Sequence, residues 1–163
     1  TLPLLDALPI FGSSLNQGGL GLDLQDKYYV YDFWNDRFAG KLSGVDTLSQ
    51  KLRSGETRML SIHAVENNPQ FLSTNRHIMQ GLVDLPVKPV WDDSRQVMKG
   101  TSIVVGGEPY KVVIALNGFK PLRCSARDAK ATVKVTDSVN GLAELSIRSD
   151  VNREINWTVS FVK

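Results

Sequence analysis

Apolar and polar residues alternate with a period of two through most of the chain from residue 27 onward. The segment KYYVYDF, residues 27–33, places aromatic and β-branched residues on both faces of an extended chain, and such residues suit a pleated sheet. WND follows as a turn, and the alternation returns in RFAGKLSG, residues 37–44, and in TRMLSIHAV, residues 57–65. These segments predict three strands, of which the first two would pair as a hairpin.

The second half of the chain repeats the pattern in shorter units. The alternating segments are residues 94–105, 110–116, 119–126, 131–138, 142–149 and 153–162. The turn GGEP predicts that the first two of these form a hairpin. Asn-Gly steps at 117–118 and 140–141 predict two further hairpins with short loops, because both residues tolerate positive φ.

The spacing of the segments predicts the fold class. No long stretch holds the period of a helix, whereas many short strands at intervals of about 8–12 residues are typical of a sandwich. In the last segment, Ile155, Trp157, Val159 and Phe161 would share one buried face. We therefore expect an all-β chain, an antiparallel β-sandwich of Greek-key type with little or no helix.

The first 24 residues differ from the rest. They contain two Leu-Pro steps and several glycines, with leucines at no steady period. Proline disfavours helix in the residue before it, and clustered glycines mark irregular backbone. We expect residues 1–24 to be an irregular linker that packs on a surface, and residues 25–163 to form the sandwich domain.

Composition narrows the class of partners. The 163 residues are 42% hydrophobic, enough for one domain core or two small ones. The 19 basic residues are dispersed and nearly matched by 17 acidic ones, which argues against a nucleic-acid partner. No apolar run approaches the ~18 residues of a membrane span. The single cysteine, Cys124, is expected to be a small buried residue.

Metal and cofactor motifs are missing from the sequence. The two histidines, His63 and His77, are far apart, and no Cys-x-x-Cys pair accompanies them. GGLGLD follows no strand, and VVGGEP lacks the Gly-Lys-Ser/Thr ending of a phosphate-binding loop. We predict neither a metal nor a cofactor.

Two pairs of carboxylates could carry glycoside hydrolysis, which commonly needs one acid and one nucleophile or base. Asp32 and Asp36 flank Trp34, and Asp92 stands beside Asp93. The simpler interpretation places all four on polar faces or in turns. We assign no catalytic residue, and a self-sufficient sandwich enzyme stays open as a further hypothesis.

Aromatic side chains could instead stack on sugar rings. The candidates for such a platform are Trp34, Trp91 and Tyr110, whereas Trp157 lies in an apolar alternation and is expected in the core.

Two segments carry a resemblance to a known family. They are YYVYDFWNDRFAGKLSG, residues 28–44, and GETRMLSIHAVENNPQFLSTNRHIMQG, residues 55–81, and the GTSIVVGGEPYKVVI stretch continues it. Together they resemble the C-terminal β-sandwich domain of melibiase-like (α-galactosidase-like) glycoside hydrolases. The similarity is clearest over residues 28–82.

The resemblance implies a non-catalytic accessory domain. In such enzymes the catalytic carboxylates belong to a preceding (β/α)8 barrel, a pattern that this chain does not show. The implied partner is the barrel of the parent chain, and residues 1–24 would be the linker that leads from this barrel to the sandwich. The resemblance implies a secreted or periplasmic parent, although the sequence itself leaves the compartment open. The alternative is a carbohydrate-binding module for an oligosaccharide. A second copy of the chain could also cover the face that packs on a barrel.

FLSTNRHIMQG, residues 71–81, looks like an active-site motif because Arg76 stands beside His77. The resemblance implies instead that both residues tie a strand to neighbouring backbone or contact another domain. An arginine can satisfy several carbonyl groups, and a neutral histidine can bridge a donor and an acceptor.

Overall fold

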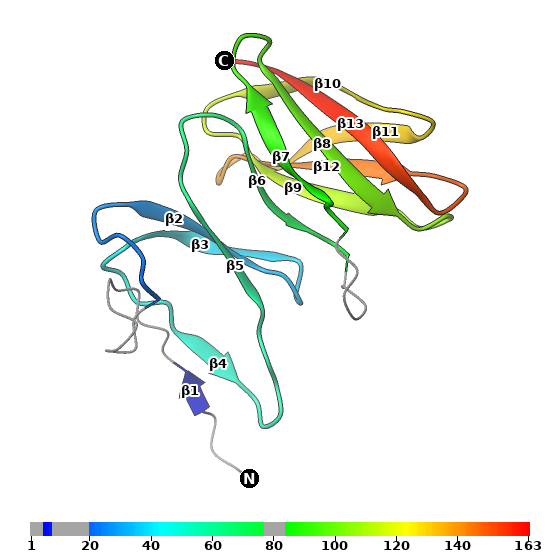
Figure 1. Ribbon diagram of the computed structural model, residues 1–163. Helices are drawn as coiled ribbons and strands as arrows, with labels where there is room; N and C mark the ends of the chain where they lie inside the picture. The colour runs from blue at the N-terminus through cyan, green and yellow to red at the C-terminus, as the bar shows by residue number, and fades with distance from the viewer. Residues whose placement is uncertain (1–4, 8–19, 77–83) are drawn as a thin grey trace. The chain divides into compact units, whose positions relative to one another are not determined.

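The chain is all-β, with antiparallel sheets in a sandwich-like arrangement. The computed structural model describes residues 5–7, 20–76 and 84–163, and these contain no helix. The described strands are β1 Leu5–Ala7, β2 Lys27–Asp32, β3 Arg37–Ser43, β4 Gln50–Leu52, β5 Leu60–Ala64, β6 Gln70–Thr74, β7 Val87–Asp92, β8 Val97–Val104, β9 Tyr110–Ala115, β10 Lys120–Ala126, β11 Lys130–Asp137, β12 Leu142–Arg148 and β13 Arg153–Val162 (Figure 1).

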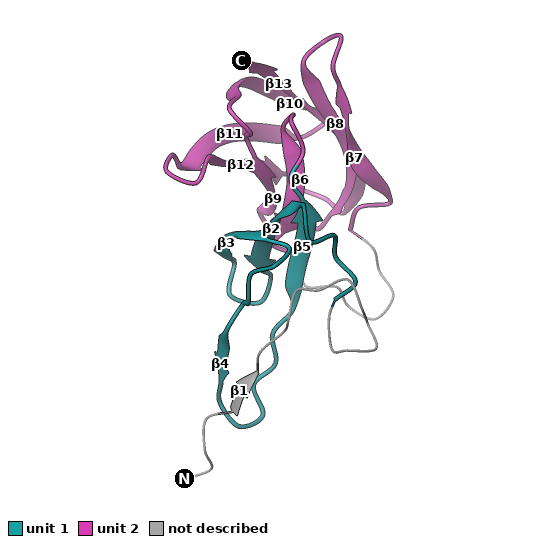
Figure 2. Ribbon diagram, turned by 90° about the vertical axis from the view of Figure 1, so that its left-hand side faces the viewer, with its two compact units in different colours: residues 1–65 teal, residues 66–163 magenta. Residues whose placement is uncertain are grey.

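The strands group into two compact units, residues 1–65 and residues 66–163 (Figure 2). The division into a segment 1–24 and a sandwich 25–163 stays a prediction, because most of that first segment lies outside the described residues. Within it, Leu5–Ala7 forms the strand β1, which pairs with β4.

Unit 1 contains a three-stranded sheet in the order β3-β2-β5. β2 is the central strand, because it pairs with a strand on each side, and all its residues after Lys27 are buried. Val30 of β2 is fully buried and packs with Leu48 at the centre of a small core. The predicted strands in residues 37–44 and 57–65 are confirmed as β3 and β5, and the predicted pairing of the first with β2 is confirmed as well.

Unit 2 is built from two four-stranded sheets, in the orders β10-β13-β8-β7 and β11-β12-β9-β6. Its core combines inward-facing side chains of both sheets, so the sheets pack face to face. The predicted buried face of β13 is confirmed, because Ile155, Trp157, Val159 and Phe161 are all buried. Burial of such side chains contributes about 1.5–3 kcal/mol each.

Trp157 shows how closely this core is packed. In the β13–β8 pairing it stands opposite Gly100, and a Cβ atom at Gly100 would overlap the indole ring. The indole Nε1 donates a hydrogen bond of 2.9 Å to the buried Ser102 hydroxyl. Glycine at position 100 is therefore required by the neighbouring tryptophan.

Two of the three hairpins predicted for the second half of the chain are wrong. β8 pairs with β13 and β7, whereas β9 pairs with β12 and β6, so the GGEP turn carries the chain from one sheet to the other. The amides of Gly106 and Gly107 donate to Asn152 Oδ1 and to the Ser149 carbonyl. The Glu108 amide also closes the turn on the Val105 carbonyl at 3.3 Å, so the turn is both closed locally and fixed to the loop before β13.

The Asn-Gly steps have mixed outcomes. Asn117 and Gly118 have positive φ, as predicted, but they connect β9 to β10 in the opposite sheet. Asn140 and Gly141 lie in the β11–β12 connection, and these strands pair as predicted. A tight turn determines how sharply the chain reverses, but the tertiary core determines which sheet the next strand joins.

Candidate functional site

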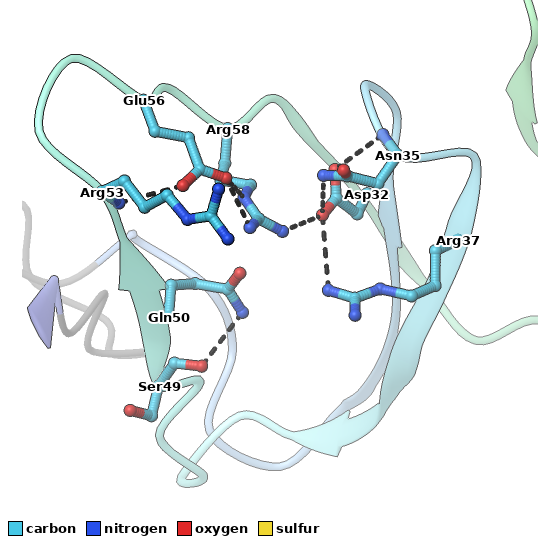
Figure 3. A network of polar contacts seen from close by, with 8 residues as sticks. All are labelled: Asp32, Asn35, Arg37, Ser49, Gln50, Arg53, Glu56 and Arg58. Carbon is cyan, nitrogen blue, oxygen red and sulfur yellow. Dashed lines mark hydrogen bonds and ion pairs between the residues drawn. The ribbon is translucent and has the colours of Figure 1, made fainter.

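A polar network surrounds Asp32, the last residue of β2, in unit 1 (Figure 3). The Asp32 side chain is 0% exposed, and its Oδ2 accepts hydrogen bonds from Arg58 Nη1 at 2.7 Å and from Asn35 Nδ2 at 2.8 Å. Its Oδ1 accepts the Asn35 backbone amide at 3.3 Å. Arg37 approaches the same carboxylate only to 3.6 Å and is 61% exposed.

Arg58 links this carboxylate to a second one. Its Nε and Nη2 donate to Glu56 Oε1 at 3.1 and 2.7 Å, and the other Glu56 oxygen accepts the Arg53 amide at 2.9 Å. Gly55 makes this turn possible because its φ is 78°. The network therefore fastens the turn before β5 to the end of β2.

Electrostatics keeps both carboxyl groups ionised. Burial alone would raise the pKa of Asp32, but the hydrogen bonds and charge that it receives from Arg58 and Asn35 outweigh burial and lower it. The backbone amide of Arg53 and the side chain of Arg58 lower the pKa of Glu56. The two carboxylates in turn raise the pKa of Arg58.

This environment suits a structural ion pair and not a general acid. A catalytic carboxylic acid needs a raised pKa to hold its proton near neutral pH, and the pKa of Asp32 is shifted the other way. Its sequence partner Asp36 accepts a hydrogen bond of 2.7 Å from the Tyr31 hydroxyl. The Asp32–Asp36 pair thus serves the β2–β3 turn.

The second carboxylate pair closes the β7–β8 turn in unit 2. Asp92 accepts hydrogen bonds from Lys99 Nζ at 2.6 Å and from Ser94 Oγ at 2.8 Å, and these lower its pKa to about 2. Asp93 accepts from Trp91 Nε1 at 3.2 Å and from Gln96 Nε2 at 3.1 Å. Both side chains satisfy local donors, as the simpler interpretation predicted.

The aromatic candidates for sugar stacking divide between the units. Trp34, in unit 1, is 43% exposed, and Phe33 contacts it edge-on at a ring distance of 5.3 Å. Trp91, in unit 2, is partly buried and packs edge-on against Phe119 and Phe161. Of these candidates, Trp34 offers the more accessible ring.

The prediction that Tyr110 could stack on a sugar is wrong, because this residue belongs to the core. It is 2% exposed, and its hydroxyl donates to Asp84 Oδ2 at 2.8 Å. Burial is the main cause that raises the pKa of this hydroxyl. A ring enclosed in this way presents no face to a sugar, so Tyr110 is removed from the stacking candidates.

Arg76 has its ion-pair partner within unit 2. Its Nη1 pairs with Glu108 at 2.7 Å, and its backbone amide donates to Thr74 Oγ1 at 3.3 Å. The neighbouring Asn75 exchanges hydrogen bonds with the start of β9. Arg76 Nη2 is buried without a hydrogen-bond partner among the described residues. His77 lies outside the described residues, so contact of this pair with another domain stays a prediction.

Sequence reasoning missed a pair on β5. Ser61 Oγ lies 2.7 Å from His63 Nε2, because residues two apart on a strand share a face. A nucleophilic serine also needs a group that orients the imidazole and amide donors for an oxyanion. The pair alone supplies neither, so we interpret it as a hydrogen bond across the strand surface.

Three further features concern metal binding, a membrane span and the single thiol. The described part of the chain holds no group of three or more His, Cys, Asp and Glu side chains suited to a metal ion. Over residues 5–7, 20–76 and 84–163 no helix could span a membrane. Cys124 is partly buried against the core of unit 2, and burial raises the pKa of its thiol, so the thiolate needed for reactivity is disfavoured.

No protein-family model matches the chain, and no curated protein and no solved structure matches it either. The resemblance of residues 28–82 to melibiase-like sandwich domains therefore stays a prediction from the sequence.

Proposed function

We propose that this chain is a non-catalytic accessory domain of a glycoside-hydrolase-like, α-galactosidase-like protein. In this role it packs against the catalytic (β/α)8 barrel of its parent. The observation that supports the proposal is a buried ion pair between two residues of the resembling segments. Asp32 lies in the first segment and Arg58 in the second, and their side chains pair with each other. Arg76 likewise pairs with Glu108.

The carboxylates support the same conclusion. Hydrolysis by two carboxylates needs one that holds a proton and one that faces the sugar. Asp32 and Asp92 have lowered pKa values and are bonded to a guanidinium and to an ammonium group. Such interactions are typical of carboxylates with a structural role. In the proposal, the catalytic carboxylates of the parent belong to its barrel.

The test is hydrolysis by the pure chain. Incubated with a panel of aryl glycosides that includes α- and β-galactosides, it should release aryl alcohol at the rate of the buffer alone. Saturable turnover that Asp32→Asn or Asp92→Asn reduces by about a hundredfold or more would contradict the proposal. A variant of the exposed Asp150 controls for a general charge effect.

A carbohydrate-binding module is the second candidate, and Trp34 favours it. Its ring is 43% exposed on the β2–β3 turn, and the bonds from Asn35 to Asp32 hold that turn in one conformation. A rigid exposed indole is a suitable stacking surface for a sugar. Titration with neutral oligosaccharides should give a saturable fluorescence change that Trp34→Ala abolishes and Trp91→Phe retains. A flat titration would remove this candidate.

A further inference from the structure

The surface around the Asp32–Arg58 pair has more guanidinium groups than carboxylates. Arg37, Arg53 and Arg58 surround Asp32 and Glu56 (Figure 3). Both carboxylates make their shortest ion pairs, 2.7 Å, with Arg58. Arg37 and Arg53 are left outside these two short ion pairs.

Arg37 is only loosely held by the fold. It stands 3.6 Å from Asp32 Oδ2, an oxygen that already accepts from Arg58 and Asn35. At 61% exposure such a pair contributes little, about 0–1 kcal/mol. The donors of this guanidinium are thus open to a ligand.

Arg53 is bound to the network through its backbone. Its amide donates to Glu56, and its guanidinium adds the smallest of the attractions that lower the pKa of that carboxylate. Beside it, Gln50 Nε2 donates only to the adjacent Ser49 carbonyl, at 3.0 Å. In Figure 3 the side chains of Arg53 and Gln50 point toward that of Arg37.

This donor set fits a carboxylate. Guanidinium groups bind carboxylates with two parallel hydrogen bonds, and an amide N–H adds a further donor. Arg58 favours binding of an anion at this surface, because it neutralises the charge of the buried Asp32 carboxylate, which would otherwise repel the anion. Trp34 stands three residues before Arg37, so an exposed ring and an exposed cation flank one turn.

We propose that Arg37, Arg53 and Gln50 form a binding site for the carboxylate of an acidic oligosaccharide, a uronic-acid sugar whose ring stacks on Trp34. This inference rests on the carbohydrate-binding candidate given above and names its class of ligand. It does not depend on the accessory role.

The experiment compares two ligands of equal length, an oligogalacturonate and its methyl-esterified neutral form. Calorimetric titration of the full chain should give binding of the acidic ligand at least about tenfold tighter than that of the ester, and the difference should fall at high salt. Arg37→Met and Arg53→Met should each weaken acidic binding about tenfold. Lys27→Met, at an exposed cation on the same unit, should leave it unchanged.

Each other outcome overturns the site. Equal binding of both ligands would leave the carbohydrate-binding candidate standing without a carboxylate site, and binding of neither would remove both. Acid-selective binding that Lys27→Met weakens as much as Arg37→Met would show general charge attraction. Arg37→Lys, which keeps the charge but loses the planar fork, should bind with intermediate affinity, and circular dichroism confirms that each variant is folded.

Discussion

Replacing Arg58 with methionine tests the role of the buried ion pair most directly. The change removes the cation that donates to the fully buried Asp32 at 2.7 Å and to Glu56 at 2.7 Å. Methionine keeps most of the aliphatic stem, so the main loss is charge and hydrogen bonding. The Asp32 carboxylate is then left inside the protein with Asn35 as its remaining short donor.

The magnitude follows from burial. Leaving one partner of a buried pair uncompensated costs about 3–5 kcal/mol. Arg58 is itself 17% exposed, and Arg37 could move closer to the carboxylate, so we expect the lower end, about 3 kcal/mol. Arg37→Met removes a pair at 3.6 Å from a 61% exposed side chain and should cost less than about 1 kcal/mol.

The effect should depend on pH in a defined direction. In the native protein the pKa of Asp32 is lowered, so its stabilising contribution is present above the unfolded pKa, about 3.9, and is lost as pH falls through the folded value. In Arg58→Met burial prevails and raises the folded pKa, so the carboxylate costs stability at neutral pH and the cost disappears on protonation. The difference between the proteins should therefore be largest near neutral pH and shrink toward about pH 3.

The assay must report on unit 1. Trp34 is its single tryptophan, so urea unfolding followed by fluorine NMR of fluorotryptophan-labelled protein gives a midpoint for that unit. Adding Asp32→Asn to Arg58→Met should recover part of the loss, because a neutral amide replaces the stranded charge. A loss below about 1 kcal/mol, or one that does not change with pH, would refute the reasoning.

Three further changes test other parts of the structure. Gly100→Ala should destabilise unit 2 by about 1–3 kcal/mol, because the added methyl group overlaps the buried Trp157 ring; urea unfolding followed by the resonance of that tryptophan measures it, and a neutral result would contradict the packing. Lys99→Met should raise the pKa of Asp92 from about 2, as carbon NMR of the carboxyl group would show; because the native pKa is lowered, the variant should lose less stability as pH falls toward 2. Val139→Asp, at a turn residue that is 93% exposed, should change stability by less than about 0.5 kcal/mol, and a larger shift in the urea midpoint would mean that this side chain packs.

Local pattern predicted the strands that alternate clearly, and it missed those that do not. β2 and β13 follow directly from their periodicity. β7 was not predicted. It contains Pro89, and proline is tolerated in a strand only at an edge or a bulge. β7 is the last strand of its sheet, and its register shifts next to this proline, so both conditions hold. Edge position is a property of the assembled sheet, so one segment of sequence cannot reveal it.

The same limit applies to pairing and to the candidate site. Asp32 and Arg58 are 26 residues apart, and only the antiparallel pairing of β2 with β5 brings the two chain segments together. For Tyr110 the pattern predicted a strand correctly, but the residue was also a candidate for a sugar platform. Its ring packs in the core of unit 2, and the hydrogen bond to Asp84 satisfies its buried hydroxyl.

The polar side chains differ in how much of their hydrogen-bonding capacity the fold uses, and this difference indicates where function can lie. Asp32 and Arg58 look chemically active in sequence, but each is matched within the molecule, so a ligand would have to break a buried ion pair to reach either. Such competition costs several kcal/mol. Arg37 and Arg53 are exposed and lie outside the short ion pairs of the network, and Trp34 is 43% exposed, so the proposed ligand would reach these residues without that cost. The buried pair then acts on function indirectly, because it fixes the turn that presents the exposed residues.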